Sequence, residues 1–357
     1  MRPRLLALTT LVGVVLGLTA GPTWACGGLV NPNGSVTLVR TTTLAAYVDG
    51  VEHYVTSFEF AGAGGEFGSI VPLPGVPTKV VRGGDWTLQR LVLETQPLVV
   101  PGLAFAALAA EDAEARVLLR TRIDALDVTV LEGGGRAVGD WAREHGFLLP
   151  PDAPEVLDFY ARRSPIFMAV TFNAERAEEQ GIARGQGTPV HVAIPTPNPW
   201  VPLRILGLGA PAAAPVEADV YLLTEREPAL LPAPVPASLL GSARGRVALL
   251  DREHPGLVLE RSEPASSSLL ADLRSDRGMG WLPTKGMWLT YLRVDSRAGA
   301  LTYDLAVDAS GAGRPSPVAA GLDPEAAPGP GPGWLSGAWA VALLGAGLAA
   351  GVALARR

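Results

Sequence analysis

Alternating hydrophobic and polar positions predict a β-hairpin in the first part of the chain. Residues 35–48 and 51–60 both alternate, and they flank the dipeptide Asp49-Gly50, a pattern typical of a two-residue hairpin turn. One face of the second strand, which we expect to be buried, carries Tyr54, Thr56, Phe58 and Phe60. His53 lies on the opposite face, which we expect to be more solvated. We therefore interpret His53 as a solvated side chain rather than a ligand.

A proline-rich segment follows the hairpin and is expected to end the next strand. Residues 67–71 continue the alternation, whereas Pro72, Pro74 and Pro77 lack the backbone N–H that a sheet requires. We expect a stiff, extended segment here and treat these three prolines as a candidate contact surface. A second proline-rich segment, residues 195–202, predicts a similar surface farther along the chain.

Periodicity along the rest of the chain predicts more strands than helices. Helical spacing occurs at 85–96, 136–145, 152–163 and 266–275. Asp85 is the expected cap of the first helix, and Asp152 and Glu155 have capping-box spacing in the third. Strands are predicted at 117–123, 125–131, 166–172, 188–195, 203–208 and 218–224, with a closing hairpin from 287–294 and 300–307. The predicted fold class is α+β, with a largely antiparallel or mixed sheet and a few short helices.

Both ends of the chain predict export and a membrane anchor. Residues 1–25 combine Arg2 and Arg4 with an apolar run and a small-x-small cleavage site, as in a signal peptide. Residues 334–354 carry no charge and are long enough for a C-terminal transmembrane helix, and the arginines that follow favour a cytoplasmic tail at 355–357. Two alternatives stay open: a retained N-terminal anchor, and a C-terminal sorting signal that a protease removes.

These predictions define the domain organisation and the location. An exported α+β domain spans 26–309, with a candidate sub-boundary near 210, and a Pro/Gly-rich linker at 310–333 joins it to the predicted transmembrane helix. We expect a single-pass protein of the cell membrane whose N-terminal domain lies outside the cytoplasm. The expected partners are the membrane, through the C-terminal helix, and a protein or another component of the envelope.

The distribution of charge argues against polyanionic partners. All 35 acidic residues lie between the two hydrophobic ends, whereas four of the 29 basic residues lie at the ends, namely Arg2, Arg4, Arg356 and Arg357. The predicted exported part is therefore strongly acidic. This balance argues against nucleic acid and against anionic membrane surfaces as partners.

Motifs for catalysis, cofactors and metals are not evident in the sequence. The four histidines have no paired spacing, no Gly-x-Ser-x-Gly occurs, and His191 alternates with aliphatic residues as if it faced outward from a strand. Cys26 is the single cysteine, so no internal disulfide forms. Cleavage after Ala25 would make Cys26 the first mature residue, either lipidated or a free thiol. We predict no catalytic, cofactor-binding or metal-binding residue.

A set of short motifs resembles a known bacterial family. Cys26-Gly27-Gly28, residues 70–77, residues 127–131, the helix with Trp141 and residues 166–170 are together similar to the family catalogued as domain of unknown function 2330. The resemblance implies export and membrane tethering, and it implies no particular activity or catalytic residue.

The leading functional hypothesis is a non-enzymatic, surface-tethered interaction or scaffold module. One alternative is an envelope hydrolase with a carboxylate pair that sequence does not reveal, which predicts two acids about 5–9 Å apart in a groove. Another is a small-ligand receptor, which predicts an enclosed apolar pocket.

Overall fold

The computed structural model describes residues 29–30, 36–62, 67–95, 115–181, 188–242 and 255–322. Its strands are β1 Leu29–Val30, β2 Val36–Val48, β3 Val51–Gly62, β4 Phe67–Leu73, β5 Lys79–Arg82, β6 Arg116–Ile123, β7 Leu126–Glu132, β8 Ile166–Phe172, β9 Val190–Pro195, β10 Trp200–Val201, β11 Pro215–Thr224, β12 Ala229–Leu231, β13 Val235–Pro236, β14 Gly256–Pro264, β15 Trp288–Arg297 and β16 Leu305–Asp308. Its helices are α1 Thr87–Thr95, α2 Gly135–Glu144, α3 Ala153–Ala161, α4 Ala174–Glu179, α5 Ala237–Ser242 and α6 Ser267–Ser275, with 3-10 turns η1 Arg204–Gly207 and η2 Ala298–Ala300.

The largest sheet is built around the predicted hairpin. Its strand order is β13-β14-β15-β11-β2-β3-β9-β5, and it is mixed because β11 runs parallel to β2. The hairpin pairs Val48 with Val51, and Asp49 and Gly50 have φ values of 51° and 78°. Positive φ at both turn positions is what a two-residue turn requires and what Asp-Gly tolerates. The hairpin prediction is confirmed.

A second, antiparallel sheet of five strands has the order β1-β4-β8-β7-β6. β8 lies at its centre, and its residues from Ile166 to Val170 are buried on both faces. The strand predicted at 166–172 is confirmed in both its bounds and its central position. A small third sheet has the order β10-β16-β12.

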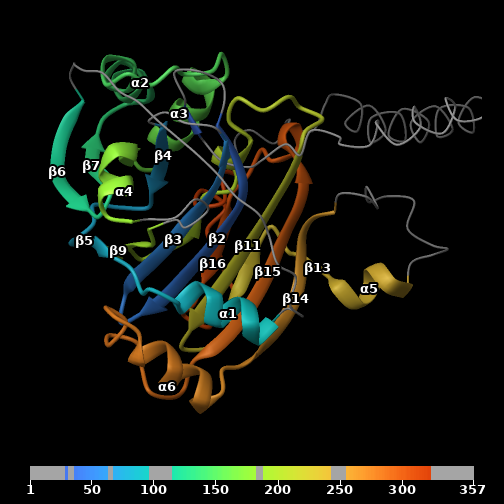
Figure 1. The fold of residues 1–357 in the computed structure, drawn as a ribbon. Helices are drawn as coiled ribbons and strands as arrows, with labels where there is room; N and C mark the ends of the chain where they lie inside the picture. Colours follow the sequence, from blue (N-terminus) through green and yellow to red (C-terminus); the bar gives the residue numbers. More distant parts are fainter. Residues whose placement is uncertain are drawn as a thin grey trace, which may run out of the picture.

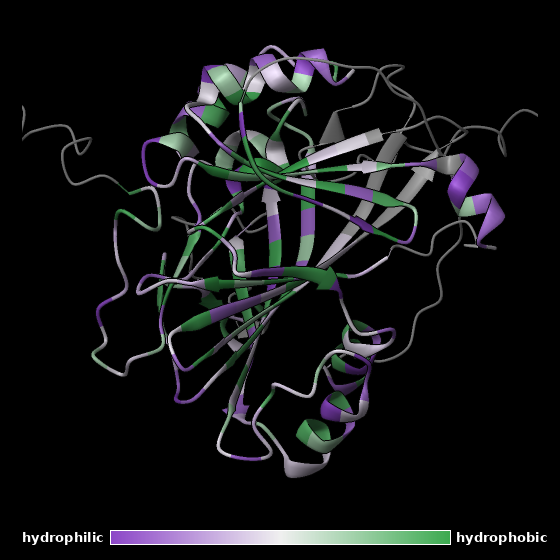
Figure 2. Cartoon of the chain, turned by 90° about the vertical axis from the view of Figure 1, so that its left-hand side faces the viewer, coloured by the Kyte–Doolittle hydropathy of each residue, from purple (hydrophilic) through white to green (hydrophobic). Residues whose placement is uncertain are grey.

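The sheets pack on one another and helices cover them outside. One core cluster joins residues of the large sheet, such as Tyr54 and Val220, to residues of the second sheet, such as Val71 and Met168. A separate cluster on the other face of the large sheet joins Leu44 to α1 and α6. Figure 1 shows α1 and α6 below the large sheet and α2 and α3 at the top of the molecule. In Figure 2 the helices carry both hydrophilic and hydrophobic residues, as expected for elements with one face packed on a sheet.

The α+β class, dominated by sheets with few helices, is confirmed. Among the described residues no helix has the length and apolar character that crossing a bilayer needs. The predicted signal peptide, Cys26 and the predicted transmembrane helix at 334–354 lie outside the described residues. Part of the predicted linker, residues 310–322, lies against the domain, with Ala320 fully buried.

Four local predictions differ from the structure because of tertiary contacts. Residues 204–207 form η1 instead of a strand, since the N–H groups before and inside this turn bind the buried carboxylate of Asp304. β15 pairs with β11 and β14, so no closing hairpin with β16 exists. Asp152 accepts a hydrogen bond from Gly209 instead of capping α3. Asp276, not Asp85, binds the N–H groups at the start of α1.

Candidate functional site

The two proline-rich segments meet at one end of the stacked sheets. Residues 74–78 lead from β4 of the second sheet to β5 of the large sheet, and residues 196–199 lead from β9 to β10 of the third sheet. A Cβ atom added to Gly75 would lie 3.3 Å from the carbonyl oxygen of Pro195, which shows how closely the two backbones approach. The N–H of Thr78 donates to the carbonyl of Ala193 at 2.9 Å.

The hairpin turn completes this end of the molecule. The N–H of Thr196 donates to the carbonyl of Gly50 at 3.2 Å, and the hydroxyl of Tyr47 donates to the carbonyl of Thr196 at 2.8 Å. We call residues 49–50, 74–78 and 195–198 the rim. The rim therefore brings together three segments that are far apart in the sequence, and backbone hydrogen bonds fix their relative positions.

The three predicted contact prolines differ in exposure. Pro72 is buried inside β4, where it pairs with Phe167, and Pro77 is buried as well, whereas Pro74 is half-buried. Val76 is 53% exposed, and Pro195, Pro197 and Asn198 on the neighbouring segment are exposed. Pro72 and Pro77 therefore shape the rim from inside, and the exposed apolar surface is offered mainly by Val76, Pro195 and Pro197.

A buried carboxyl group lies directly behind the rim. Glu52, which pairs with Tyr47 and Ile194 in the large sheet, is 1% exposed, and its Oε2 accepts a hydrogen bond from the N–H of Trp200 at 3.3 Å. Its Oε1 has no hydrogen-bond partner among the described residues. Burial raises the pKa of Glu52 to about 8, and the bond from Trp200 lowers it only in part. Glu52 is therefore a largely neutral acid at pH 7.

Two histidines meet on the opposite face of the same strands. His53 Nδ1 and His191 Nε2 are 3.0 Å apart, and the indole of Trp281 stacks on His53 with ring centroids 3.7 Å apart. Burial lowers the pKa of His53 to about 4 and that of His191 to about 3. Lys79 adds a smaller contribution for both rings, and His53 adds one for His191. His191 is 2% exposed, so the prediction that it faces outward is wrong. His53 is half-buried under Trp281 and is therefore less solvated than expected. The physical reason is that helices and the segment with Trp281 cover this face too.

The histidine pair does not extend to a larger set of ligands. No three His, Cys, Asp or Glu side chains converge on a common point within the part of the chain that the structure describes. His191 Nδ1 and Trp281 Nε1 are buried there without hydrogen-bond partners. The pair is neutral at pH 7, and its arrangement serves packing between β3, β9 and the segment that carries Trp281.

An ion pair is buried where α3 meets the third sheet. Arg163 forms a salt bridge with Asp304, and their side chains are 8% and 0% exposed. Asp304 Oδ1 also accepts hydrogen bonds from the Tyr160 hydroxyl at 2.8 Å and from the N–H groups of Leu203 and Arg204 at 2.6 and 3.0 Å. Burial raises the pKa of Asp304, while Arg163 and these donors counteract the rise. We call Arg163, Tyr160 and Asp304 the buried junction.

The buried junction also holds the last described segment. The guanidinium of Arg163 donates to the carbonyl of Ala319 at 2.7 Å, and the N–H of Asp304 donates to the carbonyl of Ala320 at 2.9 Å. The same guanidinium lies over the rings of Phe159 and Trp200, 4.2 and 4.7 Å from their centroids.

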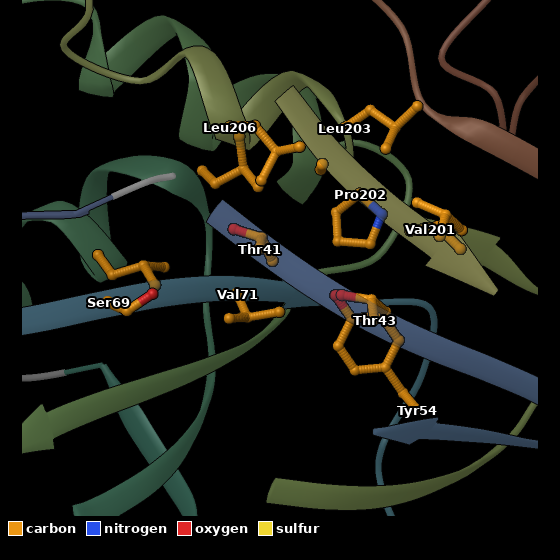
Figure 3. Close-up of a pocket in the computed structure, with 13 residues that line it drawn as sticks. Thr41, Thr43, Tyr54, Ser69, Val71, Val201, Pro202, Leu203 and Leu206 are labelled. Atoms are coloured by element: carbon orange, nitrogen blue, oxygen red, sulfur yellow. The ribbon is translucent and has the colours of Figure 1, made fainter. Parts of the chain in front are cut away.

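The structure contains one small cavity and one open groove that bear on the receptor and hydrolase hypotheses. A cavity between the sheets, shown in Figure 3 with Thr41, Ser69 and Tyr54 around it, has a volume of about 20 Å³, enough for about one water. An open groove of about 390 Å³ between α2 and α3 is lined in part by Asp140, Arg143 and Asp158. Asp140 pairs with Arg143, and both side chains are about half exposed. The cavity is too small for a ligand, and the groove acids are not sheltered from water.

Some of these groups could have been found from the sequence. Alternation along β3 places Glu52 on the same face as Tyr54, so its burial follows from the parity of the strand. The contact of His53 with His191 joins residues 138 positions apart, and the pair Arg163–Asp304 spans 141 positions. No local pattern connects such distant residues.

Comparison with solved structures gives weak similarities. The crystal structure of baculovirus P35 aligns with a TM-score of 0.37 at 10% identity, covering 77% of this chain and 97% of P35. The caspase-8/P35 complex gives a TM-score of 0.38 at 9% identity, covering 78% and 98%. A mutated P35 after caspase cleavage gives 0.32 at 8% identity, covering 76% and 94%. These values are too low to support a functional argument.

No curated protein matches the sequence significantly. A family match, in contrast, covers more than half of the chain, from residue 21 to residue 230. This range contains the hairpin, all three rim segments, the five-stranded sheet and α1 to α4. The chain therefore belongs to the DUF2330 family of uncharacterised proteins conserved in bacteria.

Proposed function

We propose that the protein is a non-catalytic interaction module of the bacterial cell envelope, tethered to the membrane by its C-terminal segment. Its contact surface is the rim, and its partner is a protein or another component of the envelope. The observation that carries the proposal is the convergence of three distant segments on one end of the molecule. There the N–H groups of Thr78 and Thr196 form backbone hydrogen bonds close to exposed Val76, Pro195 and Pro197. A surface fixed before binding loses little conformational entropy when a partner binds.

The composition of the rim suits this role. Proline restricts the unbound chain, so ordering it on binding has a small entropic cost, and proline and valine side chains offer apolar contact area. Asp49 and Lys79 lie exposed at the edges of this apolar area, as polar residues do around the core of protein interfaces.

Site-specific photo-crosslinking in the producing bacterium tests the proposal. A photoreactive amino acid at Val76 or at Pro197 should crosslink the same envelope component, identified by mass spectrometry. The matched control is Leu148, which is also an exposed apolar residue, at 60%, and lies outside the rim. Identical crosslinks from all three positions, or none from the two rim positions, would contradict the proposal. Fractionation of the same cells tests the membrane tether.

A further inference from the structure

β6 is the longest of the described strands that stand last in the order of the three sheets. β6 is eight residues long, whereas the strands at the remaining edges of the three sheets have two to four residues, namely β1, β5, β10, β12 and β13. Proteins commonly keep edge strands short because a long edge presents unpaired N–H and C=O groups to other chains. In Figure 1, β6 forms the outer margin of its sheet.

The hairpin that β6 forms with β7 shows which backbone groups are free. Ile123 pairs with Leu126 across a two-residue turn, so these two residues exchange hydrogen bonds and the pattern alternates from there. The backbone groups of Arg122 and Arg120 therefore point away from β7. β5 approaches at the turn, where Arg82 pairs with Asp124 at 2.5 Å. No backbone hydrogen bond links the outer side of β6 to any described segment.

The charged side chains of β6 itself are all basic. Its sequence contains Arg116, Arg120 and Arg122 and no acidic residue, although the chain as a whole has a net charge of −6. Arg116 and Arg122 are 76% and 68% exposed and pair with Glu132 and Asp127 on β7. Arg120 is exposed and has no ion-pair partner among the described residues. On the alternate face Thr121 is half-buried and Ile123 is buried.

From these observations we propose that β6 is a docking strand for an extended segment of a partner protein in which Asp or Glu alternates with apolar residues. The segment adds to the sheet as a sixth strand through backbone hydrogen bonds, and its carboxylates lie beside Arg120 and Arg122. Pairing of β6 with a second copy of itself is disfavoured, because antiparallel self-pairing places arginines of both copies side by side. This surface is distinct from the rim, so the inference does not depend on the proposed function.

Binding of designed peptides to the full chain tests the proposal. The probe is an N-acetylated, C-amidated, fluorescently labelled peptide in which glutamate alternates with valine, and its counterpart carries lysine in place of glutamate. Fluorescence anisotropy should show saturable binding of the acidic peptide that weakens with salt, and at least about tenfold weaker binding of the basic one. Equal binding of both peptides, or no binding of the acidic one, would overturn the proposal.

Two substitutions of Arg120 separate the contribution of its backbone N–H to binding from that of its charge. Arg120→Gln removes only the charge and should weaken binding about threefold, the usual size of one exposed cross-strand pair. Arg120→Pro also removes the outward N–H and should weaken it at least about tenfold, while an edge strand tolerates proline. Arg277→Gln, an exposed arginine elsewhere, is the control and should bind as the parent does. Unchanged binding by Arg120→Pro, or a dimer that this substitution dissociates, would overturn the proposal.

Discussion

Two buried carboxyl groups, those of Asp304 and Glu52, differ in the number and charge of the groups that surround them. Asp304 lies in the buried junction with Arg163, the hydroxyl of Tyr160 and two backbone N–H groups around it. Glu52, behind the rim, has one hydrogen bond of 3.3 Å from Trp200. Both are essentially inaccessible to water, with exposed fractions of 0% and 1%.

The difference shows what a buried acid contributes in each environment. A carboxylate with a guanidinium and several N–H donors keeps its charge and orients the groups around it, so it fixes η1, α3 and β16 relative to one another. A carboxyl with a single donor avoids the cost of a buried charge by keeping its proton. The buried junction therefore depends on electrostatic pairing, whereas the region behind the rim carries a pH-dependent energetic cost.

Removal of the guanidinium should have the largest effect. Arg163→Met leaves the carboxylate of Asp304 without its counter-charge, and loss of one partner of a buried ion pair typically costs about 3–5 kcal/mol. Denaturant unfolding should show a loss of this size in the free energy of unfolding. The matched control is Arg162→Met, one residue earlier and exposed, which should change stability by less than about 0.5 kcal/mol. Equal effects of the two substitutions would show that Asp304 does not need its counter-charge.

Glu52→Gln should stabilise the protein in a pH-dependent way. Because the folded-state pKa is about 8 against an ordinary value of 4.5, the unfolded chain releases this proton first as pH rises. The contribution of Glu52 to the free energy of unfolding therefore falls between about pH 4.5 and pH 8 and stays constant above that range. Glutamine does not titrate, so the substitution removes this loss. We expect a gain of about 1–3 kcal/mol at pH 9 and almost none at pH 4.5.

Thermal unfolding across this pH range measures the effect. The control is Glu178→Gln, in which the replaced carboxyl lies exposed on α4, and its stability difference should stay flat with pH. A difference for Glu52→Gln that does not grow with pH would mean that Glu52 is already ionised in the folded protein near its ordinary pKa.

Tyr160→Phe tests how much the uncharged Tyr160 hydroxyl of the buried junction contributes to the free energy of unfolding. The hydroxyl donates to Asp304 at 2.8 Å and accepts from the N–H of Ile205 at 2.9 Å, so its removal leaves an N–H of η1 unpaired. We expect a loss of about 1–3 kcal/mol, smaller than for Arg163→Met. Urea unfolding of the two single variants and the double variant gives the coupling energy, and strictly additive losses would contradict a shared network.

Tyr47→Phe should have the smallest effect. It removes one half-exposed hydrogen bond, from the hydroxyl to the carbonyl of Thr196 on the rim, worth about 0.5–1.5 kcal/mol. Hydrogen exchange of the backbone N–H groups of the rim should become faster, with that of β8 unchanged. Equal acceleration in both places would indicate global destabilisation instead of a local role at the rim.

The sequence was sufficient for elements whose causes are local. The hairpin follows from Asp49-Gly50 and its alternating flanks, and the central position of β8 follows from its apolar residues on both faces. Local sequence patterns do not reveal that both faces of β3 and β9 are covered. This coverage depends on α1, α6 and Trp281, which come from distant parts of the chain. For this reason the alternation along β9 predicts an outward-facing His191, whereas the side chain is buried.

The candidate site was predictable only in part, for the same reason. Pro74 directly follows β4, whereas Pro72 lies inside the strand. Nothing local indicates that residues 74–78 lie against Pro195 or that Pro72 and Pro77 point inward. Parity of β3 was enough to bury Glu52, but the approach of Trp200 that gives it one donor depends on the path of the chain after β9.

The attachment of residues 319 and 320 to Arg163 and Asp304 has a mechanical consequence. A pull on the chain beyond Leu322 would load hydrogen bonds and a salt bridge anchored in α3 and the third sheet together. Such a load must shear several bonds at once, whereas a strand pulled from a sheet edge unzips one bond at a time. A force applied at this point would therefore be carried by the buried junction and not by a single sheet edge.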